Sequence, residues 1–298
     1  MMKQKRPPTW SKAILGLAAM LAIGVAIWPF TSSHSEENSD SRAPSFPEAP
    51  VVVELFTSQG CSSCPAADRI LSQLGRASSK SPGPGTRTGS GTVIPLSYHV
   101  DYWNYIGWQD PFSQARWSQR QERYAKALES RRLYTPQAIV QGQEDCVGSR
   151  STCVLEAIAR ARKVRPKARL EGHLRKTASP TRLSLDLQGV LNEELSSTQL
   201  EAVAIVFETG LRTEIDSGEN ARRTLENDFV VRSLSPVFTL AEAGAEVGTE
   251  SRPATAEGSV TLHIDPSWDR RELGVAALLQ DSETLEIHAS WSVRGIPQ

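Results

Sequence analysis

Between residues 50 and 165 the spacing of apolar residues changes several times, which predicts alternating strands and helices. The runs Val51–Phe56 and Val93–Val100 are apolar and partly β-branched, as buried strands are. Pro136–Val140 and Asp145–Val147 predict a short hairpin around Gly142. Apolar residues at helical spacing predict three helices. The first carries Ala67, Ile70, Leu71 and Leu74, the second spans Arg116–Glu129, and the third spans Cys153–Arg162. The expected order is strand, helix, strand, helix, strand, strand, helix.

After Pro166 apolar and polar residues alternate, which is typical of strands with one buried face. The alternating sets are Leu183, Leu185 and Leu187, then Val260, Leu262 and Ile264, then Leu285, Ile287, Ala289 and Trp291. Turn residues separate these runs, so an antiparallel, sandwich-like β domain is expected over residues 166–298. The α/β pattern before it predicts a first domain over residues 50–165.

The N-terminal segment has the pattern of an export signal. Lys3, Lys5, Arg6 and Lys12 precede an uncharged apolar run, Ala13–Phe30, of eighteen residues. That length just spans a bilayer, and no clear cleavage site follows, so we expect an uncleaved membrane anchor over residues 1–30 rather than a cleaved signal. Positive charges before the span place the remainder outside the cytoplasm. Residues 31–49, rich in Ser, Glu, Asp and Pro, are expected to be a flexible linker, and 75–91 a surface loop.

Charge and cysteine content narrow the function further. Among 298 residues, 33 Lys and Arg nearly balance 34 Asp and Glu, so we expect no nucleic-acid partner. An exported chain meets oxidising conditions, and its four cysteines can therefore form disulfides. A Cys₄ zinc site is a competing interpretation, but only Cys61 and Cys64 have the spacing that it needs.

The pair Cys61 and Cys64 is the strongest chemical signal in the chain. It follows the first strand closely and precedes a predicted helix. Free N–H groups and the dipole at a helix start stabilise a thiolate, which is the reactive form of cysteine. Two sulfurs at this spacing can also close a small disulfide ring. The pattern therefore indicates redox chemistry.

Four segments carry a resemblance to a known family: VVVELFTSQGCSSCPAAD, YHVDYWNYIGWQDPF, LYTPQAIVQG and GENARRTL. Together they resemble an uncharacterised family of exported bacterial thioredoxin-like proteins, catalogued as a domain of unknown function. The resemblance runs from about Val51 to the end of the chain. It implies a thioredoxin-like α/β domain over residues 50–165, followed by the β domain.

The resemblance also implies roles for residues near the cysteines. Pro136 matches a cis-proline that faces the CxxC, and the backbone of Thr135 would then pair with an extended substrate. Cys61, expected to be the more exposed sulfur, would attack a substrate disulfide, and Cys64 would resolve the mixed disulfide.

Two further residues are candidate participants in catalysis. Glu54 lies seven residues before Cys61, near the position of the buried acid of thioredoxins; it is either a general base or an exposed residue of an edge strand. His99 ends the second strand, where sites gather in open α/β sheets, and could stabilise a thiolate or bind a metal. A structural role for His99 is the alternative.

Other segments leave alternatives open. Trp103, with Tyr105 and Trp108, either contacts the substrate or packs over the sheet. Cys146 and Cys153 bracket a predicted turn, and we expect them to form a structural disulfide. The segment Gly218–Arg223 is either a solvated turn or a part of the substrate groove.

Taken together, the sequence predicts an envelope thiol–disulfide oxidoreductase that acts on a protein or small thiol or disulfide substrate. It is expected to need no cofactor, to lie in the periplasm or cell envelope and to associate with the membrane through its N-terminus. One alternative is a copper(I)-binding module held by Cys61, Cys64 and His99, since soft thiolates and imidazole suit that ion. The other is a protein whose disulfides are purely structural.

Overall fold

The computed structural model describes residues 49–78, 92–130, 132–191, 199–240 and 255–297. The predicted membrane anchor, most of the linker and residues 79–91 of the predicted surface loop lie outside the described residues. No helix within the described ranges is both long and apolar enough to cross a bilayer. All the described residues belong to one compact unit by their contacts.

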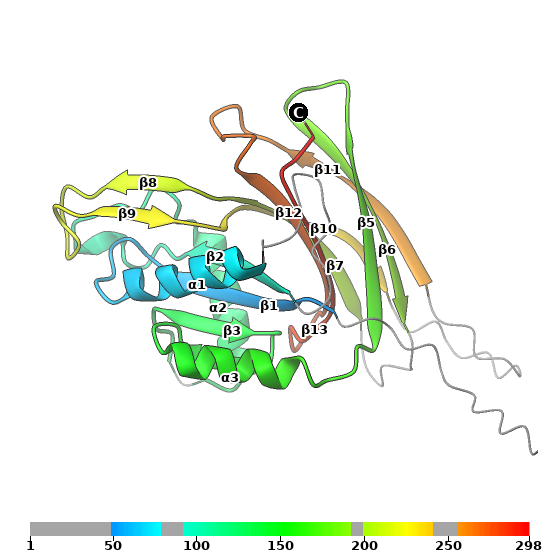
Figure 1. Ribbon diagram of the computed structural model, residues 1–298, viewed down its shortest axis with the longest axis horizontal. Coiled ribbons are helices and arrows are strands. Elements are labelled where there is room, and N and C mark those ends of the chain that lie inside the picture. The colour runs from blue at the N-terminus through cyan, green and yellow to red at the C-terminus, as the bar shows by residue number, and fades with distance from the viewer. Residues whose placement is uncertain (1–48, 79–91, 131, 192–198, 241–254, 298) are drawn as a thin grey trace, which may run out of the picture. The chain divides into compact units, whose positions relative to one another are not determined.

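The first half of the chain contains the elements that its apolar spacing predicts, in the predicted order (Figure 1). They are β1 (Val51–Thr57), α1 (Cys64–Ser78), β2 (Val93–His99), the short 3₁₀ helix η1 (Asn104–Ile106), α2 (Ala115–Ala127), β3 (Gln137–Val140), β4 (Glu144–Val147) and α3 (Ser151–Ala161). Local sequence was sufficient here because β1 and β2 are short, fully buried runs, and each helix buries one face along its length.

The second half consists of strands and contributes to three sheets. Its strands are β5 (Ala168–Lys176), β6 (Arg182–Leu191), β7 (Leu200–Glu208), β8 (Leu211–Glu214), β9 (Thr224–Asn227), β10 (Val230–Leu240), β11 (Thr255–His263), β12 (Leu273–Asp281) and β13 (Ile287–Arg294). Among the described residues, one eight-stranded sheet has the order β13-β12-β7-β10-β2-β1-β3-β4. A second sheet has the order β11-β6-β5, and β8 pairs only with β9.

The predicted fold class, a thioredoxin-like α/β domain followed by an antiparallel β-sandwich-like domain, is wrong. Strand β10 pairs in parallel with β2 at Val230 and Ser97, so one mixed sheet runs through both halves of the chain. Strand is the predominant secondary structure of the described residues, which contain thirteen strands and three α-helices. The pairing that joins the halves links residues far apart in sequence, which local periodicity does not reveal.

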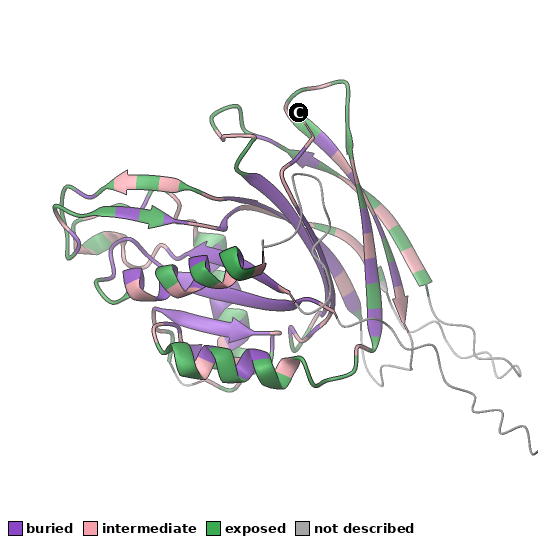
Figure 2. Cartoon of the chain, in the orientation of Figure 1, coloured by how far each residue is buried: buried purple, intermediate pink, exposed green. Residues whose placement is uncertain are grey.

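The central strands β7 and β12 explain why the two halves share one sheet. Nearly every residue of both strands is buried, so both faces of the sheet must be covered there (Figure 2). One face packs against β5, β6 and β11 through an apolar core that includes Leu185, Ala204 and Ala277. The other face shares a core with β1, β2 and α2 that includes Phe56, Tyr98 and Ile205.

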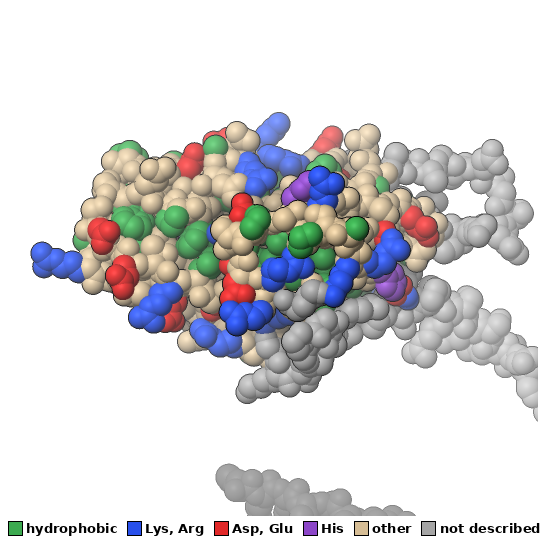
Figure 3. All heavy atoms as spheres, turned by 90° about the horizontal axis from the view of Figure 1, so that it is seen from above, with side chains coloured by type: hydrophobic (Ala, Val, Ile, Leu, Met, Phe, Trp, Pro, Cys, Tyr) green, Lys and Arg blue, Asp and Glu red, His purple; other side chains and the backbone are tan. Residues whose placement is uncertain are grey.

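A third core positions the start of α1. It lies between helices α1 and α3 and the face of β1, β3 and β4 that carries Val53, Leu55 and Ala138. Helix α1 therefore begins at the carboxyl end of β1, on the opposite face of the sheet from α2. On the face shown in Figure 3, side chains of both charge signs are spread over the surface.

Candidate functional site

Cys61 and Cys64 form a disulfide at the start of α1. Cys64 is the first residue of the helix, and its N–H donates to the Cys61 carbonyl at 3.2 Å. The Cys61 N–H donates to the Ser58 carbonyl at 3.2 Å, which turns the chain from β1 toward the helix. We call residues 58–63 the cysteine loop.

Both cysteines are buried, although the two serines between them are exposed. Cys61 is 1% exposed and Cys64 is fully buried. Cys61 is the more exposed of the two cysteines, as expected, but the difference is negligible because both side chains are closed to solvent. A substrate disulfide can reach Cys61 only after a neighbouring group moves.

Thr135 and Pro136 lie beside the disulfide, as the resemblance implies. The bond between them is cis, and the Thr135 carbonyl oxygen is 3.9 Å from the Cys61 sulfur. The Thr135 hydroxyl is buried and has no hydrogen-bond partner among the described residues. The structure thus brings Thr135, Pro136 and both cysteines together.

His99 lies on the α1 side of the sheet, because it pairs in register with Thr57 of β1. Its Nδ1 is 2.7 Å from Asp110 Oδ2, and both residues are buried. Burial opposes a charged ring, but the Asp110 carboxylate and its hydrogen bond hold the pKa of His99 above the usual value. The Nε2 atom of His99 is buried and lacks a partner among the described residues.

Asp68 is the site residue that the sequence reasoning missed. It lies one helical turn after Cys64 on the buried face of α1, and it accepts a hydrogen bond from Thr57 Oγ1 at 2.9 Å. Burial raises the pKa of Asp68 to about 6, against the opposing effects of His99 and the Thr57 hydroxyl. Its signal was present in the sequence, because position 68 falls on the same helical face as Cys64, Ala67 and Leu71.

Glu54 is not brought to the cysteines. It is fully buried on the α2 side of the sheet, where Arg120 Nε and Nη2 donate to its two oxygens at 2.8 and 3.1 Å. The hydroxyl of Tyr124 also donates to it, and Arg120 continues to Gln280 Oε1 of β12 at 2.9 Å. Glu54 is therefore neither exposed nor close to the sulfurs. It forms a buried ion pair with Arg120 within the first half of the chain, and Arg120 links this pair to the second half through Gln280.

The aromatic loop after β2 packs against the cysteine loop. The carbonyl oxygen and Cβ of Trp103 lie 3.3 and 3.4 Å from the position that a Cβ on Gly60 would take. Trp108 Nε1 donates to Gln59 Oε1 at 3.2 Å, whereas Tyr105 is 85% exposed. Trp103 and Trp108 thus support the loop that carries Cys61.

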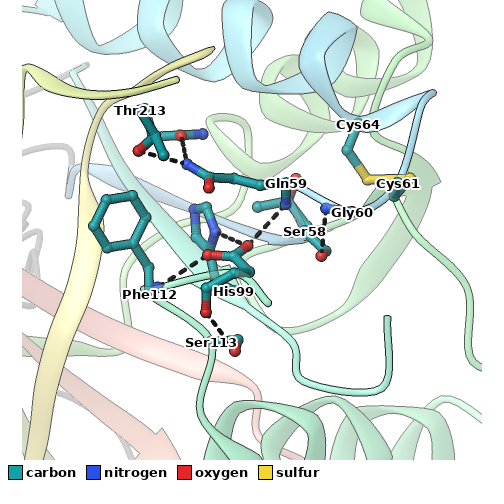
Figure 4. A network of polar contacts seen from close by, with 12 residues as sticks. Ser58, Gln59, Gly60, Cys61, Cys64, His99, Phe112, Ser113 and Thr213 are labelled. Carbon is teal, nitrogen blue, oxygen red and sulfur yellow. Dashed lines mark hydrogen bonds and ion pairs between the residues drawn. A yellow bond between two sulfur atoms is a disulfide. The ribbon is translucent and has the colours of Figure 1, made fainter. Parts of the chain in front are cut away.

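Gln59 links the cysteine loop to its surroundings through almost every polar atom (Figure 4). Its N–H donates to Asp110 Oδ2 at 2.8 Å, the same oxygen that pairs with His99 Nδ1. Its side-chain amide donates to Thr213 Oγ1 at 3.0 Å and to Asn227 Oδ1 at 2.8 Å, in strands β8 and β9. The network fixes the backbone two residues before Cys61.

The segment that joins β8 to β9 lies on the cysteine loop, so it is not a free solvated turn. Glu219 Oε2 accepts the Ser62 N–H at 3.0 Å. Asn220 Nδ2 donates to the carbonyls of Gln59 and Cys61 at 2.9 and 3.0 Å. Sequence spacing gave no sign of these contacts, which join residues more than 150 positions apart.

Cys146 and Cys153 form the predicted second disulfide, which links β4 to α3. All four cysteines are therefore paired, and the Cys₄ zinc pattern does not assemble. Within the described ranges no three His, Cys, Asp or Glu side chains group as a metal site. His99 pairs with Asp110 instead of joining the sulfurs in a copper site.

Comparisons with known proteins bear on fold and family. No curated protein matches the sequence. A structural-genomics protein from Agrobacterium tumefaciens is similar in structure, with a TM-score of 0.59, 24% identity, and coverage of 85% of this chain and 97% of that one. HBP35 of Porphyromonas gingivalis is similar with a TM-score of 0.57 and 13% identity, over 86% of this chain and 79% of that one.

At these identities the two structures show a shared fold and no shared activity. The sequence evidence goes further, because one family matches residues 52–280, from the first strand to the end of β12. That stretch contains both disulfides, the Thr135–Pro136 bond and the segment that joins β8 to β9. The chain belongs to this family, which is described as "Protein of unknown function (DUF1223)".

Proposed function

We propose that this protein is a thiol–disulfide oxidoreductase of the cell envelope that uses Cys61 and Cys64. The observation that carries the proposal is the disulfide at the start of α1 with the buried carboxyl of Asp68 one turn behind it. A disulfide alone needs no proton acceptor, whereas a pair that cycles between thiols and disulfide does. A carboxyl whose pKa is about 6 can take and return that proton near neutral pH.

In the first step the reduced protein meets a substrate disulfide. The Cys61 thiolate attacks one substrate sulfur, a bond forms between them, and the substrate S–S bond breaks. The departing substrate sulfur leaves as a thiolate and takes a proton from solvent. Cys61 is then joined to the substrate as a mixed disulfide.

In the second step Cys64 resolves the mixed disulfide. Its thiol gives its proton to the Asp68 carboxylate, and the resulting thiolate attacks the Cys61 sulfur. The Cys61–Cys64 bond forms, and the second substrate sulfur leaves as a thiolate. Protein and substrate have exchanged two electrons, and the reverse sequence oxidises a substrate dithiol.

The surroundings of Cys61 suit a protein or small disulfide substrate. The Thr135 carbonyl, 3.9 Å from the Cys61 sulfur, is a hydrogen-bond acceptor for the backbone of an extended chain. Trp103, against Gly60, would border that chain. Thr135 and Trp103 are therefore the residues that we expect to contact the substrate.

A second candidate function rests on the burial of both sulfurs. A disulfide that is closed to solvent resists exchange, and Cys61–Cys64 would then be a purely structural bond. The two candidates differ in reduction potential and in turnover.

The test measures the reduction potential of Cys61–Cys64 and turnover of a model protein disulfide with a dithiol reductant. Cys61→Ser should abolish turnover, and Cys64→Ser should accumulate the mixed disulfide. The matched control is the double variant Cys146→Ser with Cys153→Ser, which removes the other disulfide and should keep turnover.

A potential above about −300 mV together with this pattern supports the oxidoreductase. A potential below that value, with no turnover in the unmodified protein, would establish the structural bond instead.

The proposed location rests on the sequence of residues 1–30, whose positive charges precede an apolar run. We propose that this segment anchors the protein in the membrane with the described residues outside the cytoplasm. Fractionation of the full chain and of a chain lacking residues 1–30 tests this. Membrane retention should require the segment, and recovery of the full chain in the soluble fraction would contradict the anchor.

A further inference from the structure

A loop from the second half of the chain is hydrogen-bonded to the backbone around Cys61. We call residues 215–223, between β8 and β9, the cover loop. Its contacts with the cysteine loop are the Glu219 bond to the Ser62 N–H and the two Asn220 bonds to the carbonyls of Gln59 and Cys61. The cover loop thus holds the backbone on both sides of the Cys61 sulfur.

Asn220 is built into this position. It is fully buried, and Arg223 Nη1 donates to its side-chain oxygen at 2.7 Å, which directs its amide N–H groups toward the cysteine loop. Ser217, near the other end of the loop, donates to the Gly107 carbonyl. Polar contacts at several points therefore close the loop.

Apolar packing contributes little to the closed position. Among the residues that the structure describes, strands β8 and β9 pair only with each other, outside the two larger sheets. Within residues 211–227, all of them described, the buried apolar side chains are Ile215 and Leu225. Segments with few buried apolar contacts open at lower free energy than the core does.

Glu219 occupies the backbone N–H beside the reactive sulfur. The Ser62 N–H follows Cys61 directly and donates to Glu219 Oε2. Backbone N–H groups at a helix start stabilise a thiolate, so a reduced Cys61 would be attracted to this donor. When Cys61 is reduced and ionised, two negative groups compete for this one donor, and their repulsion weakens the closed position. In the disulfide form Glu219 has no such competitor.

We infer that the cover loop is a displaceable cap over Cys61, in which Glu219 and Asn220 hold the site closed while the disulfide is intact. This rests on the proposed function for its purpose, although its effect on access is measurable without it. Glu219 and Asn220 are thus positioning residues, which set when Cys61 is reachable.

The experiment compares the two disulfides within one protein. The oxidised chain is mixed with excess dithiothreitol at fixed pH and ionic strength, and new thiols are alkylated and quantified by mass spectrometry. The rate at Cys61–Cys64 reports opening of the cap, and the rate at Cys146–Cys153 reports general loosening. The variants are Asn220→Ala, Glu219→Ala and Glu219→Gln.

The control is Asp216→Ala, which removes an exposed negative charge from the same loop. Asn220→Ala removes both side-chain hydrogen bonds to the cysteine loop, together with the one from Arg223, and should speed reduction of Cys61–Cys64 roughly tenfold. Glu219→Ala removes one hydrogen bond to the cysteine loop and should speed reduction about threefold. Glu219→Gln keeps an acceptor and should have a smaller effect. Asp216→Ala and the rate at Cys146–Cys153 should not change.

Unchanged reduction of Cys61–Cys64 in both Asn220→Ala and Glu219→Ala would overturn the cap. Equal acceleration of both disulfides would also overturn it, because the loop would then only stabilise the fold. If Asn220→Ala fails to fold, Glu219→Ala and Ser217→Ala carry the test. A protein without turnover whose rates still follow the predicted order would refute the oxidoreductase and leave the cap standing.

Discussion

Replacing Asp68 by Asn tests whether the buried carboxyl serves chemistry at the expense of stability. Asn keeps the size of the side chain and an oxygen to accept the hydrogen bond from Thr57 Oγ1. It removes the charge and the ability to bind and release a proton. A purely structural residue and a proton acceptor should respond to this change in different ways.

The magnitude follows from the pKa of Asp68, which burial raises from 3.8 to about 6. A shift of about two units corresponds to roughly 3 kcal/mol between the protonated and ionised forms. Because the folded state holds the proton more tightly than the unfolded chain, this group lowers stability as the pH rises from about 4 to about 6. Above that window the full cost is present. Loss of the attraction to His99 will reduce the gain in Asp68→Asn, so about 1–3 kcal/mol is expected at pH 7.5.

The assay is urea unfolding of both proteins at pH 4 and pH 7.5, together with single-turnover kinetics. Asp68→Asn should be the more stable protein at pH 7.5 and should lose most of that advantage at pH 4. Resolution of the mixed disulfide by Cys64 should slow about 100-fold, and its rise with pH near 6 should disappear. Equal stability differences at the two pH values would refute the assigned burial cost. An unchanged resolution rate would refute the role of Asp68 in proton transfer.

Three other substitutions separate structural from chemical roles. Arg120→Met leaves the buried Glu54 carboxylate without its cation, so calorimetry should show a loss of about 3–5 kcal/mol, while the Cys61–Cys64 reduction potential stays unchanged. His99→Gln should destabilise the protein below the unfolded pKa of histidine; because the pKa of His99 is raised in the folded state, this loss should shrink as the pH rises through the folded value. The double variant Cys146→Ser with Cys153→Ser should lose roughly 2–3 kcal/mol of unfolding free energy in urea, a modest loss because this disulfide closes a short loop. Its turnover should stay unchanged.

The sequence predicts the elements of this fold better than their assembly. Strands β1 and β2 were found as short apolar runs, and helix α1 was found from its helical spacing. Strands β7 and β12 are also buried on both faces, and they were missed because the prediction for the second half rested on alternation, which their residues do not show. The parallel pairing of Val230 with Ser97 joins the strands of the two halves into one sheet, and no local sequence pattern predicts this pairing.

The residues of the candidate site also fall into two groups, those that local sequence predicts and those that depend on the assembled fold. Cys61 and Cys64 came from a CxxC motif at the start of a predicted helix, whereas the place of Thr135 and Pro136 was implied by the family resemblance. Asp68 was within reach of helical spacing, because it interrupts the apolar face of α1 directly behind Cys64. The role of Asn220 could not be predicted from local spacing, because its contacts with the cysteine loop depend on how the distant β8–β9 hairpin packs.

The shared sheet predicts that residues 49–165 will not fold by themselves. In the intact protein β2 pairs with β10 at its outer edge, and the core beside β2 includes Val203, Ile205 and Phe229 from the second half. Removing the second half also leaves the buried Arg120 without Gln280. The fragment would expose an unpaired strand edge together with apolar surface, and such species aggregate.

Near-UV circular dichroism and NMR spectra of the fragment, with residues 49–298 as the control, test this dependence. The control should unfold cooperatively, and the fragment should aggregate or lack fixed side-chain packing. A fragment with dispersed signals and a cooperative transition would mean that the first half is an independent domain. In that case the cover loop would be a contact between two independently folding domains. If the fragment cannot fold, the access of a substrate to Cys61 depends on the folding of both halves of the chain.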